Sequence, residues 1–246
     1  MLGRMEIEMK LSDYFQRIVC INLDRRIDRW AECIEEAERN RMVVERFSGF
    51  DHPTNGHAGC TRSHRILLRQ IAEGPDERVL VLEDDFAAVT RARLAISGFK
   101  TTQSVWKTHC SVLDGQGDLN QRFNCLIPFL PEKWDVLYLG AGYGEAPISR
   151  HNKHVIRCGS MKTTGSYGIT RDFARKWTEI VDAQTGGSLE NHPGCIDDVF
   201  GAMAKDHLFY VLQPRLIFQR KSLSDITGEE NSYLYSMSDP THENLV

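Results

Sequence analysis

The chain has 246 residues, of which 41% are hydrophobic and 26% are charged, and its formal net charge is -4. This length suits one large α/β domain or two small ones, and the composition is ordinary for a soluble globular protein. The acidic balance argues against nucleic-acid binding, which usually shows a basic field. No apolar run approaches the length of a membrane span.

The cysteines and the N-terminus give expectations about the compartment. The seven cysteines are an odd number and form no CxxC pair, so their spacing indicates neither a disulfide framework nor a zinc site. Reduced thiols in the cytoplasm are the simpler expectation. The first ten residues alternate acids with apolar side chains and lack the continuous apolar core of a secretory signal.

The pattern of apolar residues predicts alternating strands and helices. In the first part we expect a strand at 18–23, a helix with Trp30, Cys33, Ile34 and Ala37 on one face, a strand at 42–47, a helix opening at 59–64 and a strand at 79–82. After these we expect a helix at 91–96, a polar stretch without a pattern at 100–131, a strand at 134–139, a hairpin joining 154–158 to 166–169, helices at 171–181 and 196–204, and a final strand at 208–212. This order predicts an α/β fold with a mainly parallel sheet and crossover helices.

Three adjacent acids, Glu83, Asp84 and Asp85, follow the apolar run at 79–82. Open α/β sheets bind ligands at the carboxyl ends of their strands. A divalent cation would relieve the repulsion between the carboxylates, and Mg²⁺ or Mn²⁺ prefers such oxygen ligands. The alternative is an acidic turn in solvent.

Polar residues also follow the first strand, among them Asn22, Asp24, Arg25 and Arg29. Guanidinium groups at a strand's carboxyl end suit phosphate oxygens. The alternative is a solvated helix start with weak Arg–Asp pairs. No glycine-rich loop follows this strand, which argues against a dinucleotide fold or a P-loop.

Two predicted helix starts carry further candidates. The segment 59–64 includes Cys60, Ser63 and His64, and free amides at a helix N-terminus favour an anion. Ser63 could equally be an N-cap and His64 a surface histidine. Asp197 and Asp198 lead another helix, where either could act as a general base or merely complement the helix dipole.

Taken together, these segments resemble family-25 glycosyltransferases, which include lipooligosaccharide and collagen hydroxylysine galactosyltransferases. The matching segments occur in the family's order and are residues 19–29, 59–64, 81–85, 134–140, 165–169, 196–198 and 213–226. The resemblance implies a GT-A-type fold with a Rossmann-like sheet, an inverting mechanism and a UDP-sugar donor, often UDP-galactose. The acceptor it implies is a hydroxyl of a glycan or a hydroxylysine-type residue.

The resemblance also suggests roles for the candidates. Asp85 and Glu83 are expected to hold Mn²⁺ or Mg²⁺, and Asp198 or Asp197 is expected to deprotonate the acceptor, with a slight preference for Asp198. Gln219, Ser222 and Asp225 are candidates for the side of the site where no C-terminal histidine is available. The donor is expected to contact Asn22, Asp24, Arg25, Arg29, Cys60, Ser63, His64 and Asp84.

The expected organisation is a single transferase domain over 17–226, with an N-terminal extension at 1–16 and a tail at 227–246. Within it, 17–86 would form the nucleotide-sugar half and 133–226 the acceptor half, with 97–131 as an insertion or loop. Two other interpretations stay open: an inactive protein that binds a sugar nucleotide or glycan, and a metal-dependent nucleotidyltransferase. A two-carboxylate hydrolase would need neither the triple acid nor the arginines.

Overall fold

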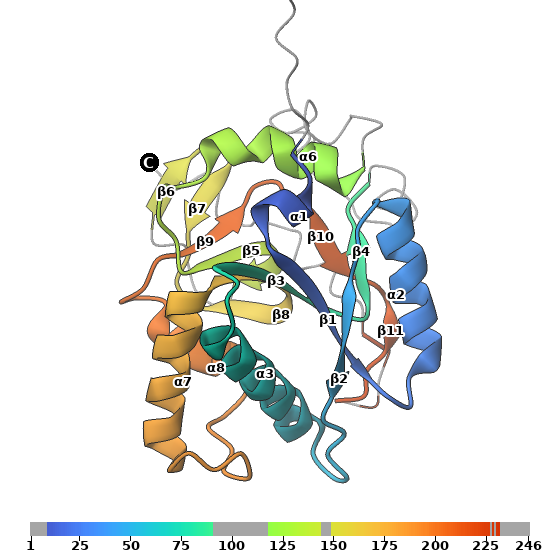
Figure 1. The fold of residues 1–246 in the computed structure, drawn as a ribbon, viewed down its shortest axis with the longest axis vertical. Helices are drawn as coiled ribbons and strands as arrows, with labels where there is room; N and C mark the ends of the chain where they lie inside the picture. Colours follow the sequence, from blue (N-terminus) through green and yellow to red (C-terminus); the bar gives the residue numbers. More distant parts are fainter. Residues whose placement is uncertain (1–8, 91–117, 144–148, 227, 229, 232–246) are drawn as a thin grey trace, which may run out of the picture.

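A central sheet with helices on both faces organises the computed structural model (Figure 1), which describes residues 9–90, 118–143, 149–226, 228, 230 and 231. Its helices are α1 (Leu11–Tyr14), α2 (Ile27–Arg39), α3 (Gly56–Glu73), α6 (Leu119–Leu126), the 3₁₀ turn η1 (Ile127–Phe129), α7 (Arg171–Thr185) and α8 (Ile196–Met203). Its strands are β1 (Arg17–Leu23), β2 (Glu45–Gly49), β3 (Arg78–Glu83), β4 (Phe86–Ala88), β5 (Val136–Tyr143), β6 (Ser149–Asn152), β7 (Val155–Arg157), β8 (Met161–Thr170), β9 (Phe209–Leu212), β10 (Ile217–Gln219), β11 (Ser222–Leu223) and β12 (Glu230–Asn231).

The eight strands of the sheet lie in the order β2-β1-β3-β8-β5-β9-β7-β6. β1 is parallel to β2 and β3, with α2 and α3 as the crossovers. β8 is antiparallel to both β3 and β5, and β5 is parallel to β9. Consequently β2, β1, β3, β5 and β9 run in one direction, while β8 and β7 run against them. The expected α/β class is confirmed, with a Rossmann-like first half and a sheet in which most strands run in one direction.

Alternate residues of each central strand pack into different cores, because successive side chains point to opposite faces. In β3, Val79 and Val81 belong to the core beneath α3, α7 and α8, whereas Leu80 and Leu82 belong to the core beneath α1, α2 and α6. Figure 1 shows these two groups of helices on the two sides of the sheet. Burial on both faces explains why β3 is a continuous apolar run in the sequence.

The end of the described chain returns to the carboxyl edge of the sheet. β10 pairs antiparallel with β4, directly beyond the triple acid. Two glycines permit this close approach: a Cβ on Gly140 would collide with the carbonyl of Ile217, and one on Gly165 would lie 2.7 Å from the Gln219 side chain. The C-terminal segment therefore reaches the same place as the ends of β1 and β3.

Several expected elements are wrong in detail. β2 begins at Glu45, three residues later than expected, and α3 begins at Gly56 with Asn55 as its N-cap. The segment 59–64 thus lies inside α3, and Ser63 is not a cap. β7 pairs with β6 and β9, while the expected partner segment at 166–169 belongs to β8, between β3 and β5.

The stretch expected to lack a pattern contains α6, which begins at a capping box formed by Asp118 and Gln121. The strand at 209–212 is followed by β10, so it is not the last. The expected helix at 91–96, most of the expected insertion, residues 1–8 of the N-terminal extension and nearly all of the C-terminal tail lie outside the described residues.

Candidate active site

A cavity of about 650 Å³ opens at the carboxyl ends of β1 and β3. The start of α3 and the loop before it form one wall, and the returning segment around Ser224–Ile226 forms another. The charged and polar groups that line it include Arg25, Arg29, Asp51, His52, Cys60, Ser63, His64, Glu83, Asp84, Asp85, Gln219, Ser222 and Asp225. This is the edge at which open α/β sheets bind ligands.

Arginines from the start of α2 converge on Asp225. Arg25 contacts this carboxylate at 2.8 Å and Arg29 contacts it at 3.4 Å, and Arg26 makes a third, short contact. Arg25 also pairs with Asp51 at 2.5 Å and is half exposed. Since guanidinium groups bind carboxylate and phosphate oxygens in the same way, the arginines form an anion-binding group that holds a carboxylate of the chain itself.

Two of the three adjacent acids, Asp84 and Asp85, are paired by Arg29 rather than left in solvent. The Arg29 guanidinium lies 2.5 Å from Asp84 and 2.8 Å from Asp85, and all three side chains are buried. Asn22 donates to Asp84 at 2.6 Å from behind. Burial nevertheless raises the pKa of Asp84 to about 7, against the lowering effect of Arg29. Asp85 is therefore not part of an acidic turn in solvent, the alternative offered by the sequence, but is buried and lines the cavity.

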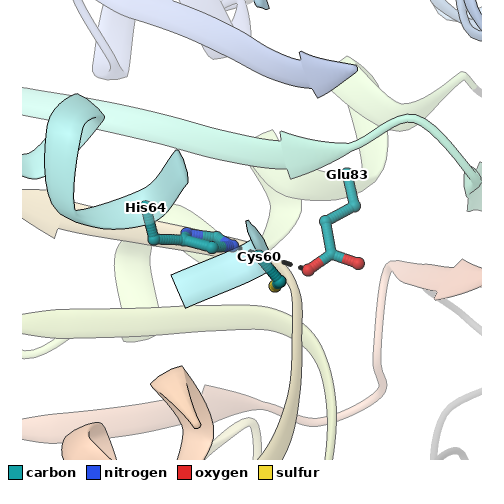
Figure 2. A group of neighbouring side chains, drawn as sticks. All are labelled: Cys60, His64 and Glu83. Carbon is teal, nitrogen blue, oxygen red and sulfur yellow. Dashed lines mark ion pairs between the residues drawn. The ribbon is translucent and has the colours of Figure 1, made fainter. Parts of the chain in front are cut away.

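One oxygen of the Glu83 carboxylate faces two side chains of α3. Figure 2 shows Cys60 and His64, one helical turn apart, with Glu83 from the end of β3 facing them. The ligand atoms of these three residues all lie within 4.8 Å of one another. His64 is 1% exposed, its Nδ1 lies 2.8 Å from the Tyr167 hydroxyl, and its Nε2 lies 3.6 Å from Glu83 Oε1. Although cysteine spacing indicated no zinc site, Cys60 thus belongs to a group that could hold a metal.

Gln219 of β10 bridges Glu83, the last residue of β3, and Asp85, which follows the strand. Its amide donates to Glu83 Oε2 at 2.8 Å and to Asp85 at 3.3 Å. The Ser222 hydroxyl donates to the other oxygen of Asp85 at 3.3 Å. Of the three candidates in the C-terminal segment, Gln219 and Ser222 contact the acids directly, whereas Asp225 pairs with the arginines.

The two acids at the start of α8 lie in different surroundings. Asp197 is mostly buried, accepts the Thr163 N–H at 2.8 Å, and has its pKa raised by burial. Thr164, which also contacts Asp197, lies 3.4 Å from Glu83 Oε1. Asp198 is exposed and pairs with Lys162 at 2.6 Å. The slight preference for Asp198 as the base is therefore not favoured by the geometry, which brings Asp197 nearer to Glu83.

Three of the residues expected to contact the donor are hydrogen-bonded to other groups of the protein instead. Asn22 lies behind Asp84 and also accepts from Arg46 at 2.7 Å, so it does not line the cavity. Asp24 is largely exposed and accepts from Ser48, and it does not line the cavity either. Ser63 does line it, but its hydroxyl donates to the Gly59 carbonyl and accepts the Phe50 N–H.

Glu83 and Asp85 were expected from the sequence to hold a hard cation, Mg²⁺ or Mn²⁺, and their contacts show whether such an ion fits. Glu83 and Asp85 supply carboxylate oxygens, the donors that Mg²⁺ and Mn²⁺ prefer, and both accept from the one Gln219 amide. A cation could replace that amide between them. The donor set fits such an ion, with Arg29 already meeting part of the negative charge of Asp85.

Sequence reasoning did not single out Asp51 or Tyr167 as parts of the site. Asp51 is an ordinary surface residue by sequence, and its place depends on the path of the loop before α3. Tyr167 reaches His64 because β8 is inserted beside β3. The four-residue spacing of Cys60 and His64 on a helix is the signal that could have indicated their shared face.

Comparisons with known proteins find distant structural similarities only. No protein-family model and no curated protein matches the sequence. Among solved structures, a glycosyltransferase involved in the glycosylation of the major capsid of PBCV-1 is 16% identical, with a TM-score of 0.35, and the alignment covers 80% of this chain and 92% of that one. A197 from STIV is 12% identical (TM-score 0.39, coverage 84% and 86%), and mannose-1-phosphate geranyltransferase from Thermus thermophilus is 11% identical (TM-score 0.34, coverage 81% and 74%). Function is therefore argued from the cavity itself.

No helix among the described residues is long and apolar enough to cross a membrane.

Proposed function

We propose that this protein is an inverting glycosyltransferase that moves a hexose from a UDP-sugar to a hydroxyl of a glycan or a hydroxylysine-type acceptor. Galactose is the sugar we propose. The observation that carries the proposal is the cavity at the ends of β1 and β3, where arginines and carboxylates meet. A nucleoside diphosphate needs positive charge for its phosphates, and glycosyl transfer needs a base for the acceptor. Both kinds of group lie in or beside this cavity.

The arginines would bind the diphosphate. Arg25 and Arg29 line the cavity and already hold the carboxylate of Asp225. A diphosphate presents more negative charge than one carboxylate and suits the same guanidinium groups. Cys60, His64 and Asp84 also line the cavity and would contact the rest of the donor.

Negative charge develops on the diphosphate as it leaves, and it would be neutralised within the same cavity. Glu83 and Asp85 would hold Mn²⁺ or Mg²⁺, which supplies positive charge beside the leaving group when bound. Arg29 is fixed by Asp84 and Asp85, so it adds a preorganised charge that needs no rearrangement.

Asp197 is the preferred general base. A raised pKa suits a carboxylate that must accept a proton from a hydroxyl near neutral pH. The Thr163 N–H holds one oxygen of Asp197 and thereby fixes the orientation of the side chain. Asp198 would then stabilise the start of α8 and pair with Lys162.

A donor screen tests the proposal. The purified chain is incubated with Mn²⁺ and a set of UDP-sugars, and the release of UDP is followed with and without acceptors. Release of UDP from one sugar donor, stimulated by an acceptor, is expected. Binding of UDP-sugars without turnover would indicate the inactive alternative. Release of pyrophosphate from a nucleoside triphosphate and a sugar phosphate would indicate the nucleotidyltransferase.

A further inference from the structure

Cys60, His64 and Glu83 have the composition of a zinc ligand set, with one pair of ligand atoms at tetrahedral spacing and all of them within 4.8 Å of one another. Thiolate, imidazole and carboxylate are the three side chains that bind Zn²⁺, whereas Mg²⁺ and Mn²⁺ favour oxygen alone. Ligand bond lengths of about 2.0–2.3 Å at tetrahedral angles separate neighbouring ligand atoms by roughly 3.4–3.6 Å. The distance from His64 Nε2 to Glu83 Oε1 is 3.6 Å, and the remaining ligand atoms lie within 4.8 Å.

The contacts around His64 leave one nitrogen free for a metal. Metal-binding histidines usually hold their second ring nitrogen in a hydrogen bond, which fixes the ring. Here Tyr167 contacts Nδ1 at 2.8 Å. Nε2 is buried and has no hydrogen-bond partner among the described residues, although a buried polar atom normally has one. It faces Glu83 across a gap too long for a hydrogen bond.

Glu83 can bind an ion through one carboxylate oxygen and keep its hydrogen bond to Gln219 through the other. Its Oε2 accepts from Gln219 at 2.8 Å, while Oε1 faces His64, with Thr164 at 3.4 Å. All three candidate ligands also line the cavity. Three protein ligands that face a cavity leave the fourth tetrahedral position of the ion open. Catalytic zinc sites have this arrangement, whereas structural zinc sites have four protein ligands.

We propose that Cys60, His64 and Glu83 bind one Zn²⁺-class ion, with its open position toward the cavity, where it would take an oxygen atom of the bound ligand. This site shares Glu83 with the hard-cation position at Asp85: Oε1 of Glu83 faces His64, and Oε2 lies on the side of Gln219 and Asp85. It does not depend on the transferase activity proposed above, because the three residues would bind the ion in the absence of any substrate.

Cobalt titration of the full chain tests the site, since Co²⁺ replaces Zn²⁺ and reports its ligands by absorption. After removal of bound metal with a chelator, Co²⁺ should produce the visible bands of a tetrahedral ion and a near-ultraviolet band from thiolate-to-cobalt charge transfer. Zn²⁺ should displace it at one equivalent per chain. No thiolate band in the wild-type protein would overturn the proposal and leave His64 and Glu83 as an ion pair.

Matched variants locate the ion. Cys60→Ser changes one atom and should abolish the thiolate band, whereas Cys195→Ser should keep it, although Cys195 also lies beside a histidine, 3.4 Å from His57. Tyr167→Phe should weaken Co²⁺ binding by roughly 10–100-fold, as expected for loss of an outer hydrogen bond to a ligand. Asp85→Asn should leave the band in place. A band that survives Cys60→Ser, or disappears with Cys195→Ser or Asp85→Asn, would place the ion elsewhere.

Discussion

The guanidinium of Arg29 lies 2.8 Å from the carboxylate of Asp85, and both side chains are buried beneath the cavity. The same guanidinium pairs with Asp84 at 2.5 Å. One cation from α2 thus holds two adjacent acids that follow β3. Breaking a buried ion pair by removing one partner is costly, because the other charge then stays buried without compensation.

Replacement of Arg29 by Met should therefore destabilise the fold by about 3–5 kcal/mol, the range for a buried pair that loses one member. Guanidinium chloride unfolding would measure the loss. Arg175→Met is the matched control: Arg175 pairs with Asp172 at 3.4 Å and both side chains are exposed, so it should cost less than about 1 kcal/mol. Equal effects of the two substitutions would contradict the role given to Arg29.

Asp225 should compete with a bound diphosphate for the arginines. Asp225→Asn should strengthen UDP binding by roughly 1 kcal/mol, about fivefold, because the guanidinium groups lose a competing partner. Calorimetry of UDP binding measures this. Asp172→Asn is the control, since Asp172 forms an exposed pair with Arg175 at 3.4 Å. Weaker UDP binding by Asp225→Asn would mean that Asp225 contacts the donor instead.

Arg25→Ala should weaken UDP binding by about 1.5–3 kcal/mol, the range for hydrogen bonds to a charged group. Arg25 is half exposed and lies at the mouth of the cavity, so the fold should persist. The same calorimetric titration, with circular dichroism as a check on folding, decides this. An unchanged affinity would remove Arg25 from the donor site.

The two acids of α8 should differ in their effects on transfer. Asp197→Asn should slow it by roughly 10²–10⁴-fold, the contribution of a general base. Asp198→Asn should change it little, because Asp198 is exposed and paired with Lys162. UDP affinity should stay near the wild-type value in both variants. A larger loss in Asp198→Asn than in Asp197→Asn would reverse the assignment.

His154 gives an expected pH dependence of stability outside the site. Burial lowers its pKa below the ordinary value of 6.5. Because folding lowers this pKa, the unfolded chain binds the proton more readily, and the associated stability is present above pH 6.5 and is lost as the pH falls through the folded pKa. Unfolding at a series of pH values should show a smaller acid loss in His154→Gln than in the wild type. His151→Gln, at an exposed position of the neighbouring strand, should leave the profile unchanged.

The fold was predictable where apolar patterns are strong. β1, β3 and β9 are buried on both faces, so their continuous apolar runs identified them within a residue or two. α6 was missed because it is short and begins in a polar stretch, where its capping box is the clearest signal. The pairing of β8 was missed because the sequence of a strand does not say which neighbours it will have.

The candidate site was predictable as a place rather than as a set of contacts. Residues at the carboxyl ends of parallel strands had to meet, and Arg25, His64 and Asp85 do line one cavity. The orientation of each side chain was not predictable. The sequence grouped Glu83 with Asp85, but tertiary packing turns one Glu83 oxygen toward His64 and the other toward Gln219. Asn22 faces away from the cavity because it follows the alternation of β1.

The position of β8 has a consequence for synthesis and folding. β8 lies between β3 and β5, yet it is separated from β3 by more than seventy residues of chain. Until it emerges, β3 would present an unpaired edge of Val79, Val81 and their neighbours, which is the kind of strand that recruits other chains. Nascent or truncated chains that end before Met161 should therefore aggregate or require chaperones, whereas chains that reach Thr170 can join the two halves of the sheet.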